Sequence, residues 1–302
     1  MNVKANPKLI VIIGVLCVSL TSILIKLSQA PPFAMLFYRL LFTIFILSGI
    51  VCFKKKEELK KLTRKQFQIC ILVGLVFSFH ILSWILAVRN TSIASAVILS
   101  DCHPIFVVIL GYIFLREKLP KKAIAGILIS FIGCVLISFM DLLKGGNHIV
   151  GDLFGIATAF FMAVYFIMGR VVRENLSNYI YIFLVYGWAF VFVTIFAIAT
   201  KTPFYPYPLR EYLIFLGLAV FCTILGHGLI NWGLEYVKPS FASTAFLLEP
   251  IYASAIALFL FHEIPSIWQI VGGAIIIYGL YMYNRYEEAR KITQEEQAAI
   301  KS

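Results

Sequence analysis

His103 and Glu249 are ionisable residues within apolar segments, and each stands directly before a proline. A charged side chain at the centre of a membrane costs about 2.5–3.5 kcal/mol on insertion scales, so such a residue is a candidate for binding a substrate or an ion. Pro104 and Pro250 disfavour helix at the residue before them. We expect His103 and Glu249 to line a cavity beside locally opened helix and to bind a proton or a substrate ammonium. The alternative is a buried hydrogen-bonded pair, or two residues that face loops.

Aromatic and polar side chains form a second set of candidate substrate-binding residues. Trp84 follows His80 by four residues and Asn231 follows His227 by four, so each pair shares one face of a helix. Histidine titrates near neutral pH, and an aromatic and polar face suits an amphipathic organic substrate. The set comprises His80, Trp84, Tyr165, His227, Asn231 and Trp232. The alternative for the two tryptophans is an ordinary place in the interior or at the lipid interface.

Other charged residues lie within apolar segments or at their ends. Lys26 and Arg39 fall in the outer thirds of their segments, where snorkelling to the headgroups is the default expectation. Arg39 begins about 9 Å into its helix at 1.5 Å per residue, so the alternative is a bidentate contact to a substrate carboxylate. Asp101 points away from the face of His103, and we expect it to contact a neighbouring helix. Glu263 is expected to be a helix-end cap or a gate contact, as is Glu117.

The elements that position these residues are membrane helices. The chain has 302 residues, of which 61% are hydrophobic and 14% are charged, whereas a soluble domain has roughly 45–50% apolar and about 25% charged residues. Ten apolar segments approach the roughly 20 residues that a span needs, and each must be a helix because the bilayer core holds no water. They are residues 9–28, 33–53, 67–88, 92–115, 122–140, 153–172, 179–200, 211–235, 240–261 and 266–283.

The net charge of +11 comes from Lys and Arg between the spans, which argues against a nucleic-acid partner. Most of these residues fall in the segments that share a side with the N-terminus. The positive-inside rule then predicts a multi-pass protein of the plasma (inner) membrane with both termini cytoplasmic, including a polar tail at residues 285–302. The six cysteines lack metal or disulfide spacing, so we expect no metal and no cofactor.

One stretch of the sequence is duplicated. Residues 94–133 align with residues 240–279 without a gap, at a constant offset of 146, and His103 and Glu249 are equivalent at that offset. The shared residues include prolines, a glutamate and glycines, which are costly or special in apolar helices: Pro104 and Pro250, Glu117 and Glu263, Gly126 and Gly272, Gly133 and Gly279. Small residues allow close helix approach in lipid, so we expect the glycine-bearing helices to be packing elements.

The duplication predicts an all-α membrane protein of ten helices in two five-helix repeats, residues 8–140 and 152–284. Five crossings are an odd number, so the second repeat enters the membrane from the opposite side. Inverted repeats of this type are an architecture of secondary transporters, with the substrate site near the midplane between the repeats.

Several motifs carry a family resemblance. They are Ile25–Leu27, Pro32 with Arg39, Asn90–Ala96 leading to Pro104, and Leu115–Leu119 followed by two glycines. In these the chain resembles the drug/metabolite transporter superfamily, specifically its ten-helix branch with two EamA domains. The resemblance implies export or exchange of amino acids, other metabolites or drugs. The second half departs from the first at His262–Pro265 and has no lysine that matches Lys26, so any role of Lys26 is asymmetric.

The chain has no Walker-type phosphate loop and no nucleophile elbow. We therefore expect no enzymatic activity, and we expect a gradient to supply the energy. The predicted function is secondary transport by alternating access, with export of amino acids or related small metabolites and a proton as the candidate coupling ion. Two fused repeats make a monomer sufficient. The alternatives are multidrug efflux or metabolite uptake on the same fold, or a membrane sensor or enzyme without flux.

Overall fold

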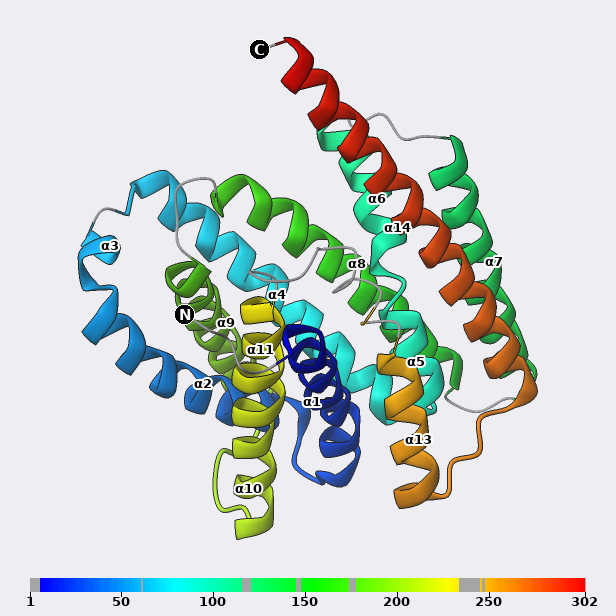
Figure 1. Ribbon diagram of the computed structural model, residues 1–302. Helices are drawn as coiled ribbons and strands as arrows, with labels where there is room; N and C mark the ends of the chain where they lie inside the picture. The colour runs from blue at the N-terminus through cyan, green and yellow to red at the C-terminus, as the bar shows by residue number, and fades with distance from the viewer. Residues whose placement is uncertain are drawn as a thin grey trace.

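The computed structural model describes residues 6–60, 62–115, 121–144, 148–173, 178–233, 245 and 248–301, and its regular secondary structure is helical (Figure 1). The helices of the first half are α1 (Pro7–Leu27), α2 (Pro32–Lys54), α3 (Lys56–Lys60), α4 (Arg64–Asn90), α5 (Ile93–Ser100), α6 (His103–Leu115) and α7 (Lys121–Lys144). Those of the second half are α8 (His148–Arg173), α9 (Asn178–Ala199), α10 (Leu209–Gly217), the π-helix η1 (Leu218–Gly226), α11 (His227–Gly233), α13 (Glu249–Phe261) and α14 (Ile267–Lys301).

Each of the ten expected spans corresponds to helix. Seven segments are long and apolar enough to cross a membrane, and the shorter apolar helices Ile124–Ile137, Glu249–Phe261 and Ile267–Tyr283 occupy the other three. Three spans are not continuous α-helices in the part of the chain that the structure describes. In the span expected at 240–261, Leu248 lies in a turn directly before α13. The span expected at 92–115 is divided into α5 and α6, and the span at 211–235 contains the π-helix η1. The segment after Asn284 continues α14 as helix.

Local signals set several of the helix ends. Pro32 opens α2, where the missing proline N–H is no loss. Thr63 and Gln66 form a capping box at the start of α4, with Gln66 N donating to Thr63 Oγ1 at 3.2 Å. Ser92 caps α5 by accepting from Ser95 N at 3.1 Å. At the other end of a helix, His262 adopts a left-handed φ of 55° and ends α13.

The α7–α14 seam shows how the repeats are related. A Cβ added to Gly126 would lie 2.6 Å from the carbonyl oxygen of Gly279, and one added to Gly133 would lie 2.6 Å from that of Gly272. Residue numbers rise along α7 as they fall along α14, so the two helices are antiparallel. Ser130 Oγ donates to the carbonyl oxygen of Ile276 at 3.2 Å, and these residues are 146 apart. The pseudo-two-fold axis therefore passes between them, and the repeats are inverted.

Contacts elsewhere obey the same symmetry. Helix α1 packs against η1 and α11, and its counterpart α8 packs against α4. Likewise α13 packs against α1, and its counterpart α6 packs against α8. Each repeat thus sets its first helix against the third and fourth spans of the other repeat. The centre of the molecule is built from both repeats.

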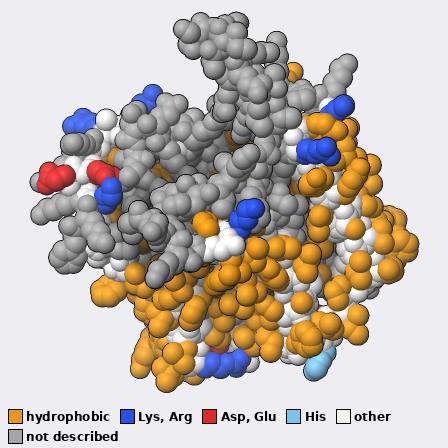
Figure 2. Space-filling model, in the orientation of Figure 1, with side chains coloured by type: hydrophobic (Ala, Val, Ile, Leu, Met, Phe, Trp, Pro, Cys, Tyr) orange, Lys and Arg blue, Asp and Glu red, His pale blue; other side chains and the backbone are white. Residues whose placement is uncertain are grey.

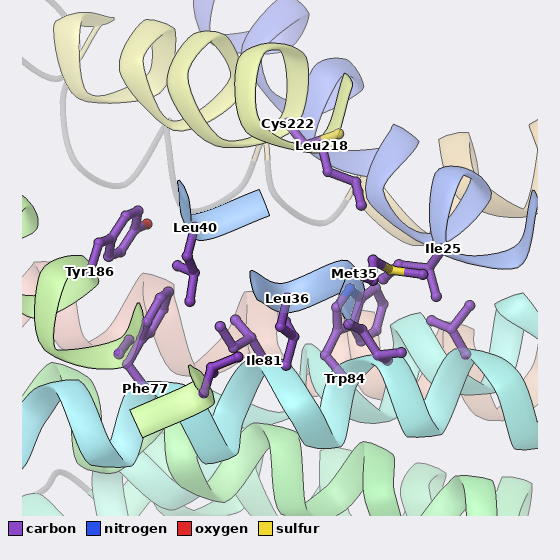
Figure 3. Close-up of a cluster of buried hydrophobic side chains, with 14 of the residues drawn as sticks. Ile25, Met35, Leu36, Leu40, Phe77, Ile81, Trp84, Tyr186, Leu218 and Cys222 are labelled. Atoms are coloured by element: carbon purple, nitrogen blue, oxygen red, sulfur yellow. The ribbon is translucent and has the colours of Figure 1, made fainter. Parts of the chain in front are cut away.

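The surface and the interior are both apolar. Apolar side chains cover much of the described surface in Figure 2, and exposed Phe45, Phe259 and Ile132 are typical of a face that contacts lipid. The largest buried cluster joins α1, α2, α4, α9 and η1. Figure 3 shows part of it, with Cys222 and Leu218 of η1 across from Phe77 of α4.

Candidate functional site

The two residues before the repeated prolines stand at helix starts. Asp101 ends α5, Cys102 lies in a turn, and His103 begins α6, so the helix is locally opened here as expected. Glu249 is the first residue of α13, after a turn in which Leu248 N donates to Ala245 O at 3.0 Å. Most of the segment that precedes Glu249 lies outside the described residues.

Three predicted site residues lie near a fourth, His80. The Nδ1 atom of His80 lies 3.1 Å from the carbonyl oxygen of Thr158, which joins α4 to α8. The His80 imidazole also lies within electrostatic range of three predicted site residues, namely Arg39, His103 and His227. Helices α2, α4, α6 and α11 therefore bring their polar side chains to one region.

Arg39 points into the protein rather than to the headgroups. Its side chain is 8% exposed, and Nε and Nη2 donate to Thr223 Oγ1 at 3.2 and 3.1 Å. The Thr223 hydroxyl in turn donates to the carbonyl oxygen of Leu218, five residues earlier, at 2.9 Å. The snorkelling expected by default for Arg39 is wrong, because the π-helix η1 presents a hydroxyl to it in the interior. Nothing in the sequence singled out Thr223.

Glu249 lies near a second acidic residue. Its side chain is 7% exposed and lies within electrostatic range of Asp101 on α5 and of Cys222 on η1. The ring of His103 instead packs 5.4 Å from Phe166. Asp101 therefore faces a neighbouring helix as expected, and its Oδ2 atom is buried without a hydrogen-bond partner among the described residues.

Aromatic rings pack against the polar residues. Tyr165 and Trp84 are buried, at 7% and 9% exposed. Phe77 lies 5.3 Å from Tyr165 and stacks on Tyr186 at 4.8 Å. Sequence reasoning missed Tyr186, because α9 is apolar all round and gives no facial signal. The side chains of Asn231 and Trp232 lie outside the described part of the structure, so their predicted roles stay predictions.

Lys26 and Glu263 form a latch at one end of the bundle. Lys26 Nζ and Glu263 Oε1 make an ion pair, with 30% and 24% of their side chains exposed. The other carboxylate oxygen of Glu263 accepts from Ile93 N at 3.1 Å. We call these three groups the Lys26 latch. It ties the ends of α1 and α13 to the start of α5, so Glu263 is a contact between helix ends.

A second layer of contacts surrounds the Lys26 latch. Gln269 Nε2 donates to Ser92 Oγ and to Ser95 Oγ, each at 2.8 Å, which joins α14 to α5. A small pocket beside it is lined by residues that include Ser254 and Glu263. Sequence reasoning missed Gln269, which lies just inside a span and reads as an ordinary boundary residue.

The same end of the bundle is tied once more, through Glu211 at the start of α10. Glu211 is 3% exposed and accepts from Ser28 Oγ and, at 3.0 Å, from Gln29 N. Arg89, at the end of α4, donates to the carbonyl oxygen of Ala30. These bonds fix the loop between α1 and α2 to two other helices.

The repeat does not copy the Lys26 latch. At the offset of 146, Glu117 corresponds to Glu263, but Val172 stands for Lys26 and Pro239 for Ile93. Valine has no charge and proline has no N–H, so these two positions offer neither the ammonium nor the amide hydrogen that Glu263 contacts. Glu117 itself lies outside the described residues. The two ends of the helix bundle therefore carry different residues at these equivalent positions.

Comparison with known proteins assigns the chain to a family. Residues 7–139 and 149–285 each match the EamA-like transporter family. An uncharacterized transporter of Archaeoglobus fulgidus is 27% identical over 93% of this chain and 98% of its own length, and a second one is 28% identical over 69% and 74%. The uncharacterized transporter YyaM of Bacillus subtilis is 24% identical over 82% of this chain and 81% of its own.

A solved crystal structure shares the fold, with a TM-score of 0.64 at 16% identity over 95% of this chain and 98% of that one. Two matched EamA domains, apolar spans and inverted packing agree with one another. The chain belongs to the EamA-like transporter family of the drug/metabolite transporter superfamily, and it is a multi-pass membrane transporter rather than an enzyme.

Proposed function

We propose that the protein is a secondary active transporter that exports amino acids or related small metabolites by alternating access. The observation that carries the proposal is the crossed packing of the inverted repeats, in which α13 lies against α1 while α6 lies against α8. Such a frame has two similar conformations, one open to each side of the membrane. Buried polar residues of several spans converge between the repeats, where a solute would bind.

The direction of transport is proposed from the Lys26 latch. Under the expected topology, with both termini cytoplasmic, the ends of α1 and α13 face the outside. The ion pair with Lys26 and the hydrogen bond that Glu263 accepts from Ile93 N then hold the outer gate closed. A resting state that is closed outside and loads from the cytoplasm suits an exporter. The driving gradient still sets the net flux, and a proton is the proposed coupling ion.

The test of the proposed function is flux in proteoliposomes that contain the purified protein. The panel holds the twenty protein amino acids, small organic acids, and lipophilic cations such as ethidium. We expect saturable flux of amino acids that requires an imposed gradient and exceeds that of protein-free vesicles. No flux of any solute across this panel would contradict the proposal.

Coupling is tested at Glu249. We expect Glu249→Gln to lower gradient-driven flux at least about tenfold while exchange without a gradient persists, because a neutral amide cannot release the coupled proton. Asp101→Asn is the companion variant, since Asp101 is the acidic neighbour of Glu249. A Glu249→Gln protein whose gradient-driven flux equals that of the unmodified protein at every pH between about 5 and about 8 would exclude this role.

Multidrug efflux is the second candidate, and the buried aromatic rings favour it. Phe77 stacks on His80 and on Tyr186 and lies 5.3 Å from the tilted ring of Tyr165, and aromatic faces bind organic cations. In the panel above, flux of ethidium without flux of amino acids would select this function.

A further inference from the structure

Cys102 and Cys134 bring two thiols into contact inside the first repeat. Their Sγ atoms lie 2.7 Å apart, and the two residues are buried, at 3% and 7% exposed. Each lies within an apolar stretch, Ile93–Phe114 for the first and Ile124–Ile137 for the second. The spacing of the cysteines in the sequence gave no signal for this contact, because 32 residues separate them. The pair exists only through the packing of the helices.

Cys102 lies at the helix break that separates α5 from α6. Its backbone N–H donates to Leu99 O at 3.3 Å, and Ile105 N donates to Cys102 O at 3.0 Å. Its neighbours in the chain are Asp101, which ends α5, and His103, which begins α6. A bond to the Cys102 thiol would therefore act on the turn that positions two ionisable residues of the candidate site.

Cys134 lies in the α7–α14 seam, in which the two helices run side by side along one edge of the bundle (Figure 1). It directly follows Gly133, where an added Cβ would lie 2.6 Å from Gly272 O. Both cysteines belong to an apolar cluster that joins four helices, with Ile98 of α5, Ile105 of α6, Ile137 of α7 and Ile276 of α14 among its members. A covalent bond between the thiols would tie the helix break to the seam.

The second repeat has leucines where the first has these cysteines. At the offset of 146, Leu248 corresponds to Cys102 and Leu280 to Cys134. Leucine occupies such apolar positions equally well, so packing alone does not require two thiols here. A free cysteine packs as a small apolar residue, and its reactivity distinguishes it from other apolar residues. The pair is therefore a feature of one repeat that points to thiol chemistry.

The hydrogen bonds of Cys102 turn its sulfur lone pairs towards Cys134. Its single S–H donates to Ile98 O at 3.3 Å, so the sulfur presents lone pairs to the other thiol. A disulfide bond is about 2.05 Å long, and a shift of roughly 0.7 Å would bring the two sulfur atoms to that distance. The two thiols can therefore be joined without a rearrangement of the helices.

We propose that Cys102 and Cys134 are a modification site, at which hydrogen peroxide forms a reversible disulfide that slows transport. One sulfur attacks the O–O bond of the peroxide, becomes a sulfenic acid and releases one water. The second sulfur then attacks the first, the S–S bond forms, and a second water leaves. The thiols lose two electrons and two hydrogens, which reduce one peroxide to two waters. Hydrogen peroxide is small and uncharged, as a reagent for an apolar cluster must be.

The apolar surroundings also protect the disulfide once it has formed. In the cytosol, soluble thiols such as glutathione keep cysteines reduced. Transfer of a charged reductant into an apolar interior is costly, so this bond is shielded from that pool. Because the thiolate is the attacking form and an apolar site disfavours an anion, oxidation should also be slow. The site therefore responds to sustained rather than brief exposure to peroxide.

The first experiment detects the bond in the purified full-length protein. The protein is exposed to hydrogen peroxide and denatured, its free thiols are alkylated, and linked peptides are identified by mass spectrometry. We expect a Cys102–Cys134 link that dithiothreitol removes. The Tm in detergent should rise on oxidation, because a cross-link restricts the unfolded chain. Cys134→Ala should show neither the link nor the rise.

The second experiment measures flux in proteoliposomes before and after oxidation, and this arm rests on the proposed transport function. We expect peroxide to lower flux at least about tenfold, because a covalent tie removes conformations that alternating access needs, and dithiothreitol to restore it. Cys134→Ala should transport normally and resist peroxide, and Cys134→Ser, which is closer in size, replaces it should the alanine variant fail to fold. Cys70→Ala is the matched control, since Cys70 is buried on α4 away from the pair, and it should stay sensitive.

Two results would overturn the inference. Absence of the Cys102–Cys134 link after prolonged exposure to peroxide would refute the modification site. A complete link that leaves flux unchanged, or equal inhibition of Cys134→Ser and the unmodified protein, would refute its control of transport. Both leave the proposed function intact, whereas the absence of flux for every solute refutes that function and leaves the link open to detection by mass spectrometry.

Discussion

The α7–α14 seam and the Lys26 latch differ in how far the two repeats share their residues. At the seam, the copies are alike, and Gly126 meets Gly279 as Gly272 meets Gly133. At the latch, the copies share only Glu263 and its equivalent Glu117, while the partners differ. The seam glycines, which the repeats share, hold the two repeats together. The partners of Glu263, which the repeats do not share, make the two ends of the helix bundle different.

The largest effect is expected where the copies agree. In Gly279→Ala the new Cβ would lie 2.4 Å from Gly126 O and from Ser130 Oγ, so α7 and α14 must separate. Overpacking of this kind costs about 1–3 kcal/mol. We expect a lowered Tm and a loss of monodisperse protein in size-exclusion chromatography. Gly187→Ala is the matched control, because a Cβ there meets nothing within 4 Å. Equal behaviour of the two variants would mean that the seam does not hold the repeats together.

The next effect is expected at the latch. Lys26→Met removes the cation that pairs with Glu263, so the ends of α1 and α13 should part more often. We expect Ser254→Cys, beside the latch, to react several-fold faster with a membrane-impermeant thiol reagent in a cysteine-free background. The charge reversal Lys26→Glu with Glu263→Lys should rescue this only in part, because Ile93 N then loses its acceptor. No change in reactivity would show that the ion pair does not control the gate.

A lysine added to the second repeat tests whether a missing charge explains the difference between the two ends of the bundle. Val172→Lys places a lysine at the position that corresponds to Lys26 at the offset of 146. We expect a partial latch at the opposite end, weaker than the first because Pro239 offers no N–H. In the Ser254→Cys background, thiol labelling should rise about twofold as the equilibrium shifts. The control is Val172→Met, which keeps the length without the charge, and equal labelling of both variants would refute the electrostatic explanation.

The smallest effect is expected on the axis itself. Ser130→Ala loses the bond to Ile276 O, but this hydroxyl also bonds within its own helix to Gly126 O at 3.1 Å. Interhelical hydrogen bonds in membranes average about 0.6 kcal/mol. We expect a Tm change near the limit of detection and normal flux. A decrease in Tm as large as that of Gly279→Ala would mean that interhelical hydrogen bonds, rather than close backbone packing, hold α7 against α14.

The sequence predicted the all-helical architecture with its inverted repeats. Ten spans, the inversion and the glycine packing follow from apolar length and from an exact internal offset, which are properties of the chain alone. Side-chain partners do not follow in this way. Lys26 and Glu263 are 237 residues apart, and their pairing depends on how α1 meets α13. Arg39 looked like a snorkelling residue because the π-helix that brings Thr223 to it has no sequence signature.

The offset predicts equivalent positions but not contacts. It places His103 and Glu249 at equivalent positions on opposite sides of the axis. A two-fold axis brings equivalent residues together only where they lie on it, as Ser130 and Ile276 do. Away from the axis, Glu249 lies within electrostatic range of Asp101 on α5. The sequence alone does not give the position of the axis, so it does not predict this neighbour.

The end of the bundle that the Lys26 latch closes should open during transport, and one distance measurement tests this opening. Spin labels at Gln29 and Ile264, both on the exposed rim of the latch, report the separation of α1 and α13 by double electron–electron resonance. We expect a short distance in the unmodified latch and an added population of longer distances in Lys26→Met. Identical distance distributions in the two proteins would contradict it.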